Sequence, residues 1–139
     1  MGTIEDAPLG YLLHQAMSTL RPEVAAALTP LCLSLPEFVC MRMVSMNPGA
    51  SSAELARLGN VSPQAMNTVL HKLESAQMVS RPASVASGRA LPASLTADGR
   101  TLLKRAESAV READARVLAK LSASEQREFK RMLAALGRD

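Results

Sequence analysis

The sequence predicts a mainly α-helical fold with one small β-hairpin. Apolar residues recur at helical spacing over most of the 139 residues, and Ser-x-x-Glu capping boxes mark two of the helix starts. One segment between the helices lacks helical periodicity and combines β-branched residues with prolines and a central Ser-Gly, which is typical of two short strands. Hydrophobic residues make up 47% of the chain, enough for one folded domain with a real core.

The N-terminal third contains two predicted helices. Residues 8–28 place apolar side chains at helical spacing, with Pro22 as either a kink or a break and Pro30 closing the helix. A second helix opens at Pro36, because proline is tolerated in the first turn of a helix. This second helix is expected to stop at the "NPG" of residues 47–49.

Two helices joined by a short turn come next. Ser51 with Glu54 forms a capping box that opens a short helix ending at Gly59. Ser62 and Pro63 are an N-cap and first-turn pair that opens the following helix. A turn of this length is typical of a helix-turn-helix, in which the second helix usually enters the major groove of DNA. Helical hairpins that bind no DNA use similar turns.

The second helix of this pair has two faces of opposite character. One face is apolar at the spacing of a buried stripe and consists of Met66, Val69, Leu70 and Leu73. The other face consists of hydrogen-bond donors without a carboxylate, namely Gln64, Asn67, Thr68, His71 and Lys72. Since a solvated face normally includes acidic residues, this composition indicates an anionic partner.

The segment "MVSRPASVASGRALPASLT", residues 78–96, predicts a β-hairpin. Two short strands are expected at 78–81 and 90–95, with an exposed tip between them that carries Arg89. A hairpin directly after a helix-turn-helix is a wing. The predicted fold class is therefore mainly α with a small β wing, a winged helix-turn-helix.

The C-terminal third is helical again and has a different period. Apolar residues from Leu103 to Leu121 follow a repeat close to 3.5, which is typical of a seam between two helices, and Thr96 can cap this long helix. Ser122 with Glu125 is a capping box for a last helix, whose apolar face is Phe129, Met132, Leu133 and Leu136. One small domain has too few other elements to bury these apolar helix faces. We therefore expect a homodimer whose interface buries roughly 2,000 Å² of surface or more.

These elements predict three regions in one compact chain. Residues 1–34 form an N-terminal dimerisation helix, residues 35–95 form the winged helix-turn-helix, and residues 96–139 form C-terminal dimerisation helices.

The charge is unevenly distributed along the chain. The formal net charge is +3, but residues 1–60 carry −2, residues 61–105 carry +4 and residues 106–139 carry +1. The middle region is therefore where a polyanion would bind. A surplus of four positive charges can also arise by chance in the composition of a protein surface. The interpretation as a polyanion-binding region therefore needs support from the predicted fold.

Several other classes of protein find no support in the sequence. No apolar run approaches the roughly 20 residues of a membrane span, and the acidic N-terminus is no secretory signal, so we expect a cytoplasmic protein. Cys32 and Cys40 show neither a disulfide framework nor metal-ligand spacing. There is no Gly-rich phosphate loop and no HExxH or GxSxG motif, so the sequence predicts no enzyme, no catalytic or metal site and no cofactor.

The order of these elements resembles the multiple-antibiotic-resistance-type (MarR) winged-helix regulators. "SSAELARLGNVSPQAMNTVLHKLESAQMVSR", residues 51–81, resembles the DNA-binding segment of that family, and "LTADGRTLL", residues 95–103, resembles its junction between wing and dimerisation helix. The resemblance covers nearly the whole chain. It implies a homodimeric, cytoplasmic transcriptional regulator of a near-palindromic operator, often a repressor released by a small aromatic or phenolic ligand.

The resemblance also implies which residues contact double-stranded DNA. The positions on the recognition helix are Ser62, Gln64, Ala65, Asn67, Thr68, His71 and Lys72. Arg89 matches a wing-tip arginine that enters the minor groove, although Ser87 stands where the family commonly has an aspartate.

Side-chain chemistry assigns roles to several of these residues. The amides of Gln64 and Asn67 suit adenine, and Thr68 can reach a base edge or a thymine methyl. Ser62, Lys72, the N-terminal amides of the helix and Arg81 suit phosphates.

The family binds its ligands in the crevice between the first two helices and the winged domain. Tyr11, His14 and Arg42 are the candidate ligand-binding residues there, because they are polar or aromatic groups among aliphatic ones and suit an anionic aromatic compound. Such residues are often simply hydrogen-bonded at a helix interface. Two alternatives remain open: a winged helix used as a protein-interaction module, and a regulator that senses oxidants through Cys32 or Cys40.

Overall fold

The computed structural model describes residues 2–81 and 92–137, which form helices and one short two-stranded sheet. In chain order the elements are η1 (Ile4–Asp6), α1 (Leu9–Leu28), η2 (Thr29–Leu31), α2 (Leu35–Met46), α3 (Ser52–Leu58), α4 (Pro63–Ser75), β1 (Val79–Ser80), β2 (Ser94–Leu95), α5 (Ala97–Leu118) and α6 (Ala123–Leu136). This confirms the predicted mainly α fold with a small β element.

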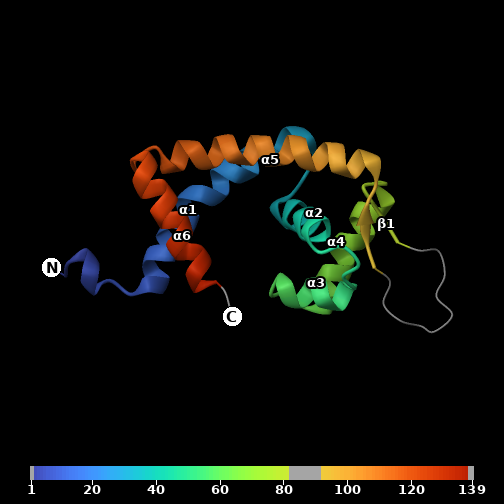
Figure 1. Ribbon diagram of the computed structural model, residues 1–139, viewed down its shortest axis with the longest axis horizontal. Helices are drawn as coiled ribbons and strands as arrows, with labels where there is room; N and C mark the ends of the chain where they lie inside the picture. Colours follow the sequence, from blue (N-terminus) through green and yellow to red (C-terminus); the bar gives the residue numbers. More distant parts are fainter. Residues whose placement is uncertain (1, 82–91, 138–139) are drawn as a thin grey trace.

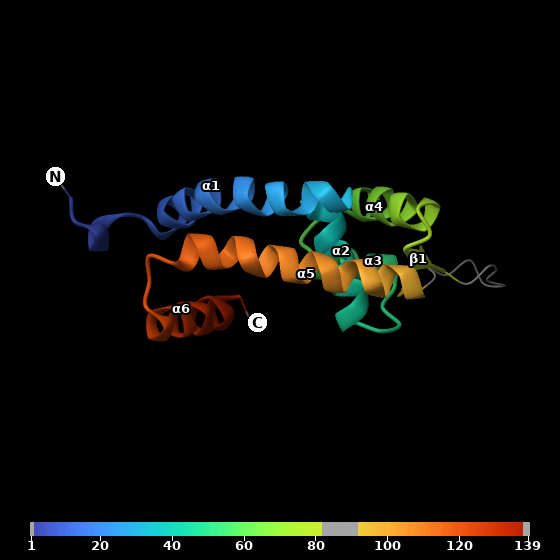
Figure 2. The same cartoon turned by 90° about the horizontal axis from the view of Figure 1, so that it is seen from above.

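The molecule has the shape of an arch (Figure 1). Helix α5 spans the top, α6 and the start of α1 descend at one end, and α2, α3 and α4 form a cluster at the other end. Helix α1 lies along α5, and α6 lies on the opposite side of α5 from α1 (Figure 2). The winged-helix elements are therefore held at one end of a long helical support.

Local capping explains where most of the helices begin. The four predicted N-cap residues each accept a hydrogen bond from a backbone N–H in the first turn: Ser51 from Glu54 at 3.2 Å, Ser62 from Ala65 at 3.1 Å, Thr96 from Gly99 at 2.9 Å, and Ser122 from Glu125 at 3.1 Å. A further capping box, Ser34 with Glu37, opens α2 and was not predicted. Its Ser-x-x-Glu spacing is visible in the sequence.

Helix α1 continues through Pro22 to Leu28. Of the two alternatives for Pro22, a break in the helix is therefore wrong. Proline removes one backbone hydrogen bond, but Val24 and Leu28 in the following turns are buried in the core and hold the helix together. Pro30 lies in the short η2 helix, beyond the end of α1.

The strands are shorter than predicted. They pair antiparallel with Val79 opposite Leu95 and Ser80 opposite Ser94, so each described strand has two residues. Since Pro92 has no N–H to donate, it cannot extend the ladder of β2. Residues 82–91, including the predicted tip with Ser87 and Arg89, lie outside the described residues.

The core joins the winged-helix cluster to the helical support. Its buried side chains come from the end of α1, from α2, α3 and α4, from both strands and from α5; the largest fully buried ones include Leu28, Met41, Leu55, Leu70, Leu73 and Val79. In the described residues no single helix is long and apolar enough to cross a membrane; only the bent pair Leu9–Leu31 and Leu35–Met46, at 79°, meets the length and composition criteria jointly.

Candidate nucleic-acid interface

The turn between α3 and α4 is fixed by backbone hydrogen bonds. The Gly59 N–H donates to the Leu55 carbonyl at 2.9 Å, and the Val61 N–H donates to the Ala56 carbonyl at 3.0 Å. The left-handed residue in the turn is Asn60, with φ of 52°, whereas Gly59 has φ of −86°. Asparagine tolerates this conformation better than most residues. The turn therefore sets the direction in which α4 leaves α3.

Helix α4 buries one face and presents the other to solvent, as predicted. Met66, Leu70 and Leu73 are at most 3% exposed and anchor the helix in the core. The opposite face is formed by the seven predicted contact residues, of which Asn67 is half-buried and the others are exposed: Ser62, Gln64, Ala65, Asn67, Thr68, His71 and Lys72. The structure brings these residues together on one stretch of surface.

The N-terminal end of α4 offers few free backbone donors. Pro63 has no N–H, and the Ala65 N–H is taken by the Ser62 hydroxyl oxygen at 3.1 Å. This leaves the N–H groups of Ser62 and Gln64 to meet an anion such as phosphate. The Thr68 hydroxyl donates to the Gln64 carbonyl at 3.0 Å, so its methyl group and the acceptor lone pairs of its oxygen are the parts available for an outward contact.

The basic side chains near α4 lie close to carboxylates of the same chain. Lys72 Nζ lies 3.4 Å from Glu37 Oε1, and Glu74 Oε1 lies 3.8 Å from His71 Nδ1 and 3.5 Å from Arg81 Nη2. The i,i+3 spacing of His71 and Glu74 is visible in the sequence. Glu37 comes from α2, far away in the chain, so no sequence pattern marked it as a partner of Lys72.

Arg81 is placed differently from the expectation that it contacts phosphate. Its side chain is only 12% exposed and is turned toward Glu74 on α4. Among the described residues its buried Nη2 has no hydrogen-bond partner, because the approach to Glu74 lacks hydrogen-bond geometry. In this arrangement Arg81 ties the strand end to α4. Its contact with phosphate stays a prediction.

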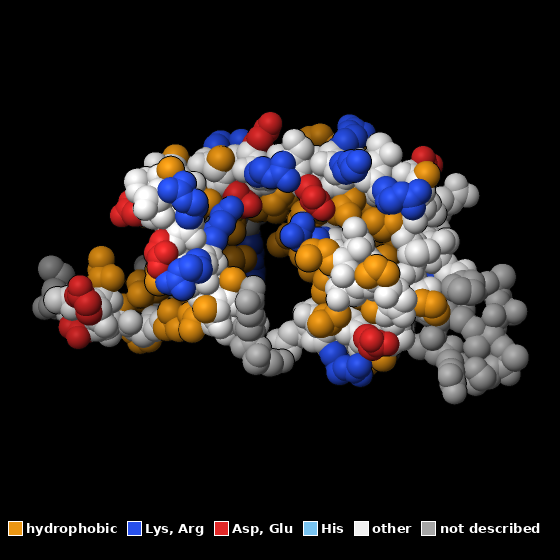
Figure 3. Space-filling model, in the orientation of Figure 1, with side chains coloured by type: hydrophobic (Ala, Val, Ile, Leu, Met, Phe, Trp, Pro, Cys, Tyr) orange, Lys and Arg blue, Asp and Glu red, His pale blue; other side chains and the backbone are white. Residues whose placement is uncertain are grey.

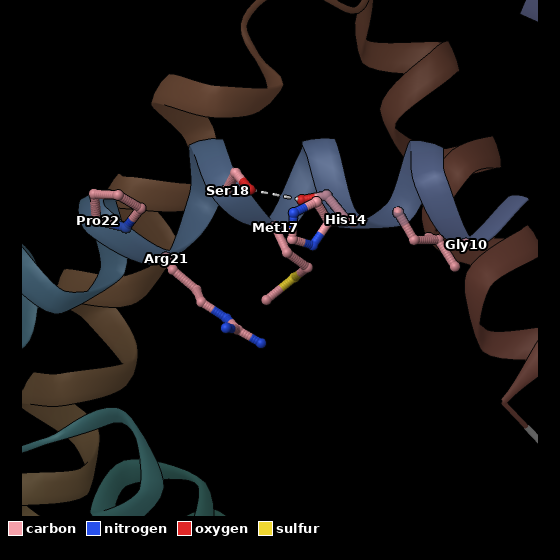
Figure 4. Close-up of a pocket in the computed structure, with 7 residues that line it drawn as sticks. Gly10, His14, Met17, Ser18, Arg21 and Pro22 are labelled. Carbon is pink, nitrogen blue, oxygen red and sulfur yellow. Dashed lines mark hydrogen bonds between the residues drawn. The ribbon is translucent and has the colours of Figure 1, made fainter. Parts of the chain in front are cut away.

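Two of the three candidate ligand residues lie on α1. His14 lines an open cavity of about 430 Å³ together with Met17 and Arg21, all on one side of the helix (Figure 4). The Ser18 hydroxyl beside them donates to the His14 carbonyl at 2.9 Å. Tyr11 is 56% exposed, and its hydroxyl accepts a hydrogen bond from Gln15. Tyr11 does not line this cavity.

Arg42 lines a different cavity, of about 370 Å³, between α2, α5 and α6. Its lining combines two apolar side chains with three cations and two carboxylates: Phe38, Arg42, Glu107, Val110, Arg111, Asp114 and Lys130. Arg42 Nη1 lies 3.4 Å from Glu107 Oε1. Lys and Arg side chains lie along α5 and border the hollow under the arch (Figure 3). The structure therefore separates Arg42 from Tyr11 and His14 within one chain.

The two cysteines have different environments. Cys32 is exposed, whereas Cys40 is buried with its Sγ 3.7 Å from Met66 Sδ. Burial raises the pKa of the Cys40 thiol to about 11, against a smaller lowering effect of the Arg81 charge. Cys40 is therefore a protonated, inert thiol at neutral pH.

A capped helix-turn-helix whose second helix exposes a polar face, followed by a short antiparallel sheet, defines a winged helix-turn-helix of the DNA-binding class. The sequence profile of the MarR family matches residues 33–91. The HTH-type transcriptional repressor Rv2887 of Mycobacterium tuberculosis (strain ATCC 25618 / H37Rv) is 69% identical over 139 residues, which is all of both chains. This chain belongs to the MarR family.

Solved structures agree with this assignment. A crystal structure of the M. tuberculosis MarR family protein Rv2887 in complex with DNA has a TM-score of 0.81 and 63% identity, over 96% of this chain and 100% of that one. A structure of the same protein with salicylic acid has a TM-score of 0.80 and 69% identity, over 97% of this chain and 100% of that one. The sequence-based resemblance to the family is thereby confirmed.

Proposed function

We propose that this chain is a transcriptional repressor that binds DNA as a homodimer and is released by a small aromatic acid. The observation that carries the proposal is the outward face of α4, where the amide and hydroxyl groups of Gln64, Asn67 and Thr68 form no ion pair and the described carboxylates lie only beside His71 and Lys72. Gln64 and Asn67 would read base edges in the major groove, while Ser62 and the Gln64 N–H would contact phosphate. The relative Rv2887, described as a repressor and crystallised with DNA, supports the same function.

Dimerisation would use residues 1–34 and 96–139, leaving residues 35–95 to bind DNA. Helix α6 has no buried residue within the chain, and Met132, Leu133 and Leu136 on it are 47%, 38% and 68% exposed. Leu133 also lines an apolar groove between α1, α5 and α6, whose other apolar residues include Leu13, Met17, Leu20, Val117 and Phe129. A second copy that covers this surface would place two α4 helices at half-sites about 34 Å apart on a near-palindromic operator.

The binding of an aromatic acid is supported best by the Arg42 cavity. A carboxylate there would compete with Glu107 for the Arg42 guanidinium, while Phe38 and Val110 would contact the ring. Since the cavity joins α2 to α5 and α6, an occupant would shift the winged-helix cluster against the dimerisation helices if it binds the two states unequally. The relative Rv2887 crystallised with salicylic acid supports this ligand class.

A gel shift with the DNA upstream of the gene tests the DNA-binding function. The native protein is expected to retard this duplex at concentrations that leave a scrambled duplex of equal length free. Equal retardation of both duplexes, or of neither, would contradict the proposal and favour a protein-interaction module.

Titration of salicylic acid into the protein–DNA complex tests the release. Arg42→Gln is expected to raise the concentration needed for half-release by about ten-fold, because the charge-assisted contact is lost. Arg21→Gln, which alters the cavity on α1, is the matched control and is expected to release like the native protein. If Arg21→Gln raised the concentration instead, the acid would bind on α1.

A further inference from the structure

Glu37 is the one charged side chain that is buried within the described residues. It lies in the first turn of α2, outside the surface expected to contact DNA, and its side chain is 10% exposed. A buried carboxylate is unfavourable unless other groups compensate its charge. The partners of Glu37 therefore indicate why the residue is placed there.

One oxygen of Glu37 serves two purposes. Oε1 accepts hydrogen bonds from the Ser34 hydroxyl at 2.7 Å and from the Ser34 N–H at 3.4 Å, which completes the capping box of α2. The same oxygen lies 3.4 Å from Lys72 Nζ on α4. The capping box thus also fixes a lysine of the recognition helix.

Lys72 would otherwise be free to reach for phosphate. Its side chain is 71% exposed and flexible, and a lysine ammonium group can contact a DNA phosphate whatever the base sequence is. The ion pair with Glu37 lowers the net charge that Lys72 presents to DNA and draws its ammonium group toward α2. Both effects would weaken non-specific DNA binding, which depends on the attraction between basic side chains and phosphates.

From this arrangement, and resting on the DNA-binding function proposed above, we propose that Glu37 is a positioning residue that sets the specificity of DNA binding. It holds Lys72 away from non-specific phosphate contacts and fixes α4 against α2. Discrimination between DNA sequences then depends on Gln64, Asn67 and Thr68 rather than on charge.

The test compares Glu37→Gln with the native chain by fluorescence anisotropy on the upstream duplex and on a scrambled duplex over a range of salt concentrations. Glutamine keeps the shape and the cap acceptor but releases Lys72. The affinity for the scrambled duplex is expected to rise about five-fold near 0.1 M salt, and its salt slope to steepen by about 0.9, the value of one phosphate contact. The affinity ratio between the two duplexes is expected to fall accordingly.

Glu54→Gln is the matched control. Glu54 occupies the same position in the capping box of α3, where its Oε1 lies 3.1 Å from the Ser51 hydroxyl, and it forms no ion pair within the described part of the chain. The Glu54→Gln variant is expected to keep the native affinity ratio between the two duplexes and the native salt slope. An equal change in both variants would show that a lost cap is responsible and would overturn the proposal.

The two partners of the ion pair are also tested together. In a Lys72→Gln background, adding Glu37→Gln is expected to change neither the salt slope nor the affinity ratio between the two duplexes, because no lysine at position 72 remains to be released. If circular dichroism shows that Glu37→Gln does not fold, Lys72→Gln alone decides. A salt slope for the scrambled duplex within about 0.3 of the native value supports the proposal, and a slope shallower by about 0.9 overturns it.

Two further outcomes separate this inference from the proposed function. A native chain that binds both duplexes equally would refute the proposed function. Native discrimination between the duplexes, unchanged in Glu37→Gln, would refute only this inference.

Discussion

Thr68 shows how a single hydrogen bond narrows what a side chain can read. Its hydroxyl donates to the Gln64 carbonyl at 3.0 Å within the helix, so the donor is already used. The sequence left a base edge and a thymine methyl as alternatives for Thr68. Within the described structure the hydroxyl has no proton left to donate and keeps only its acceptor lone pairs, so we expect the methyl group to make the main contact with a base.

Substitutions at Thr68 separate these alternatives. Thr68→Val keeps a methyl group and removes the hydroxyl, so its affinity for the operator is expected to stay within about 0.5 kcal/mol of native, whereas Thr68→Ala is expected to lose about 1 kcal/mol. Anisotropy titrations measure both. Uracil in place of thymine in the operator should abolish the difference between the variants. A loss in Thr68→Val as large as in Thr68→Ala would show that the hydroxyl makes the contact.

The buried thiol of Cys40 predicts a pH-dependent reactivity. Its pKa is raised from 9.0 to about 11 by burial, so the protonated form is favoured in the folded state. Its contribution to stability is complete below pH 9.0 and is lost as the pH rises through about 11. Iodoacetamide at about pH 8 is expected to modify the exposed Cys32 and to spare Cys40. Equal labelling of both cysteines in a mass spectrum would revive oxidant sensing through Cys40, which burial disfavours; sensing through the exposed Cys32 stays an open alternative.

At the scale of the elements, the junction between the wing and α5 brings two backbone segments into close contact. A Cβ atom on Gly99 would lie 2.0 Å from the Met78 carbonyl oxygen, which itself accepts a hydrogen bond from the Thr96 N–H at 3.0 Å. The contact holds the start of α5 against the residue preceding β1. Glycine is required here by this close approach.

Gly99→Ala is expected to lower the free energy of unfolding by about 2 kcal/mol or more, because backbone atoms must move apart. Gly10→Ala on α1 is the matched control: no atom outside its own helix lies within 4 Å of the added Cβ, so a stabilisation of up to about 1 kcal/mol is expected. Urea denaturation of both variants measures the difference. Equal stability of the two would contradict the crowding at Gly99.

The sequence predicted the elements well where the signal is local. Caps such as Ser51 and Thr96 act on the next three residues, so their pattern is complete in a short window. Contacts between separate elements left no such pattern: nothing in the sequence marked Glu37 on α2 as a partner of Lys72, or Glu74 on α4 as a partner of Arg81 beyond the end of β1. The assignment of DNA contacts within residues 35–95 remains a prediction.

At the scale of the whole molecule, the arch leaves apolar side chains at the end formed by α1 and α6. Leu9, Tyr11 and Ile4 near the N-terminus are 58%, 56% and 79% exposed, and α6 adds exposed leucines. A large exposed apolar surface of this kind marks an interface. The 3.5-residue repeat predicted from the sequence that helices pack along a seam. The repeat does not identify the partner helix, nor whether that helix belongs to the same chain or to a second copy.

Leu136→Asp is expected to shift the protein from dimer toward monomer and to weaken operator binding, because a charge would be buried in the interface. Leu58→Asp is the matched control, since Leu58 on α3 is 58% exposed against 68% for Leu136 and lies at the other end of the arch. Sedimentation equilibrium measures the oligomeric state. A Leu136→Asp protein that remains a native-like dimer would place the interface elsewhere.

The most direct test of the central claim, that the outward face of α4 reads DNA, is the affinity of Asn67→Ala for the upstream duplex and for single-base variants of it. The claim predicts a loss of about 1 to 3 kcal/mol on the upstream duplex, confined to particular base positions, with unchanged binding to a scrambled duplex. Native affinity of Asn67→Ala for every duplex would contradict it.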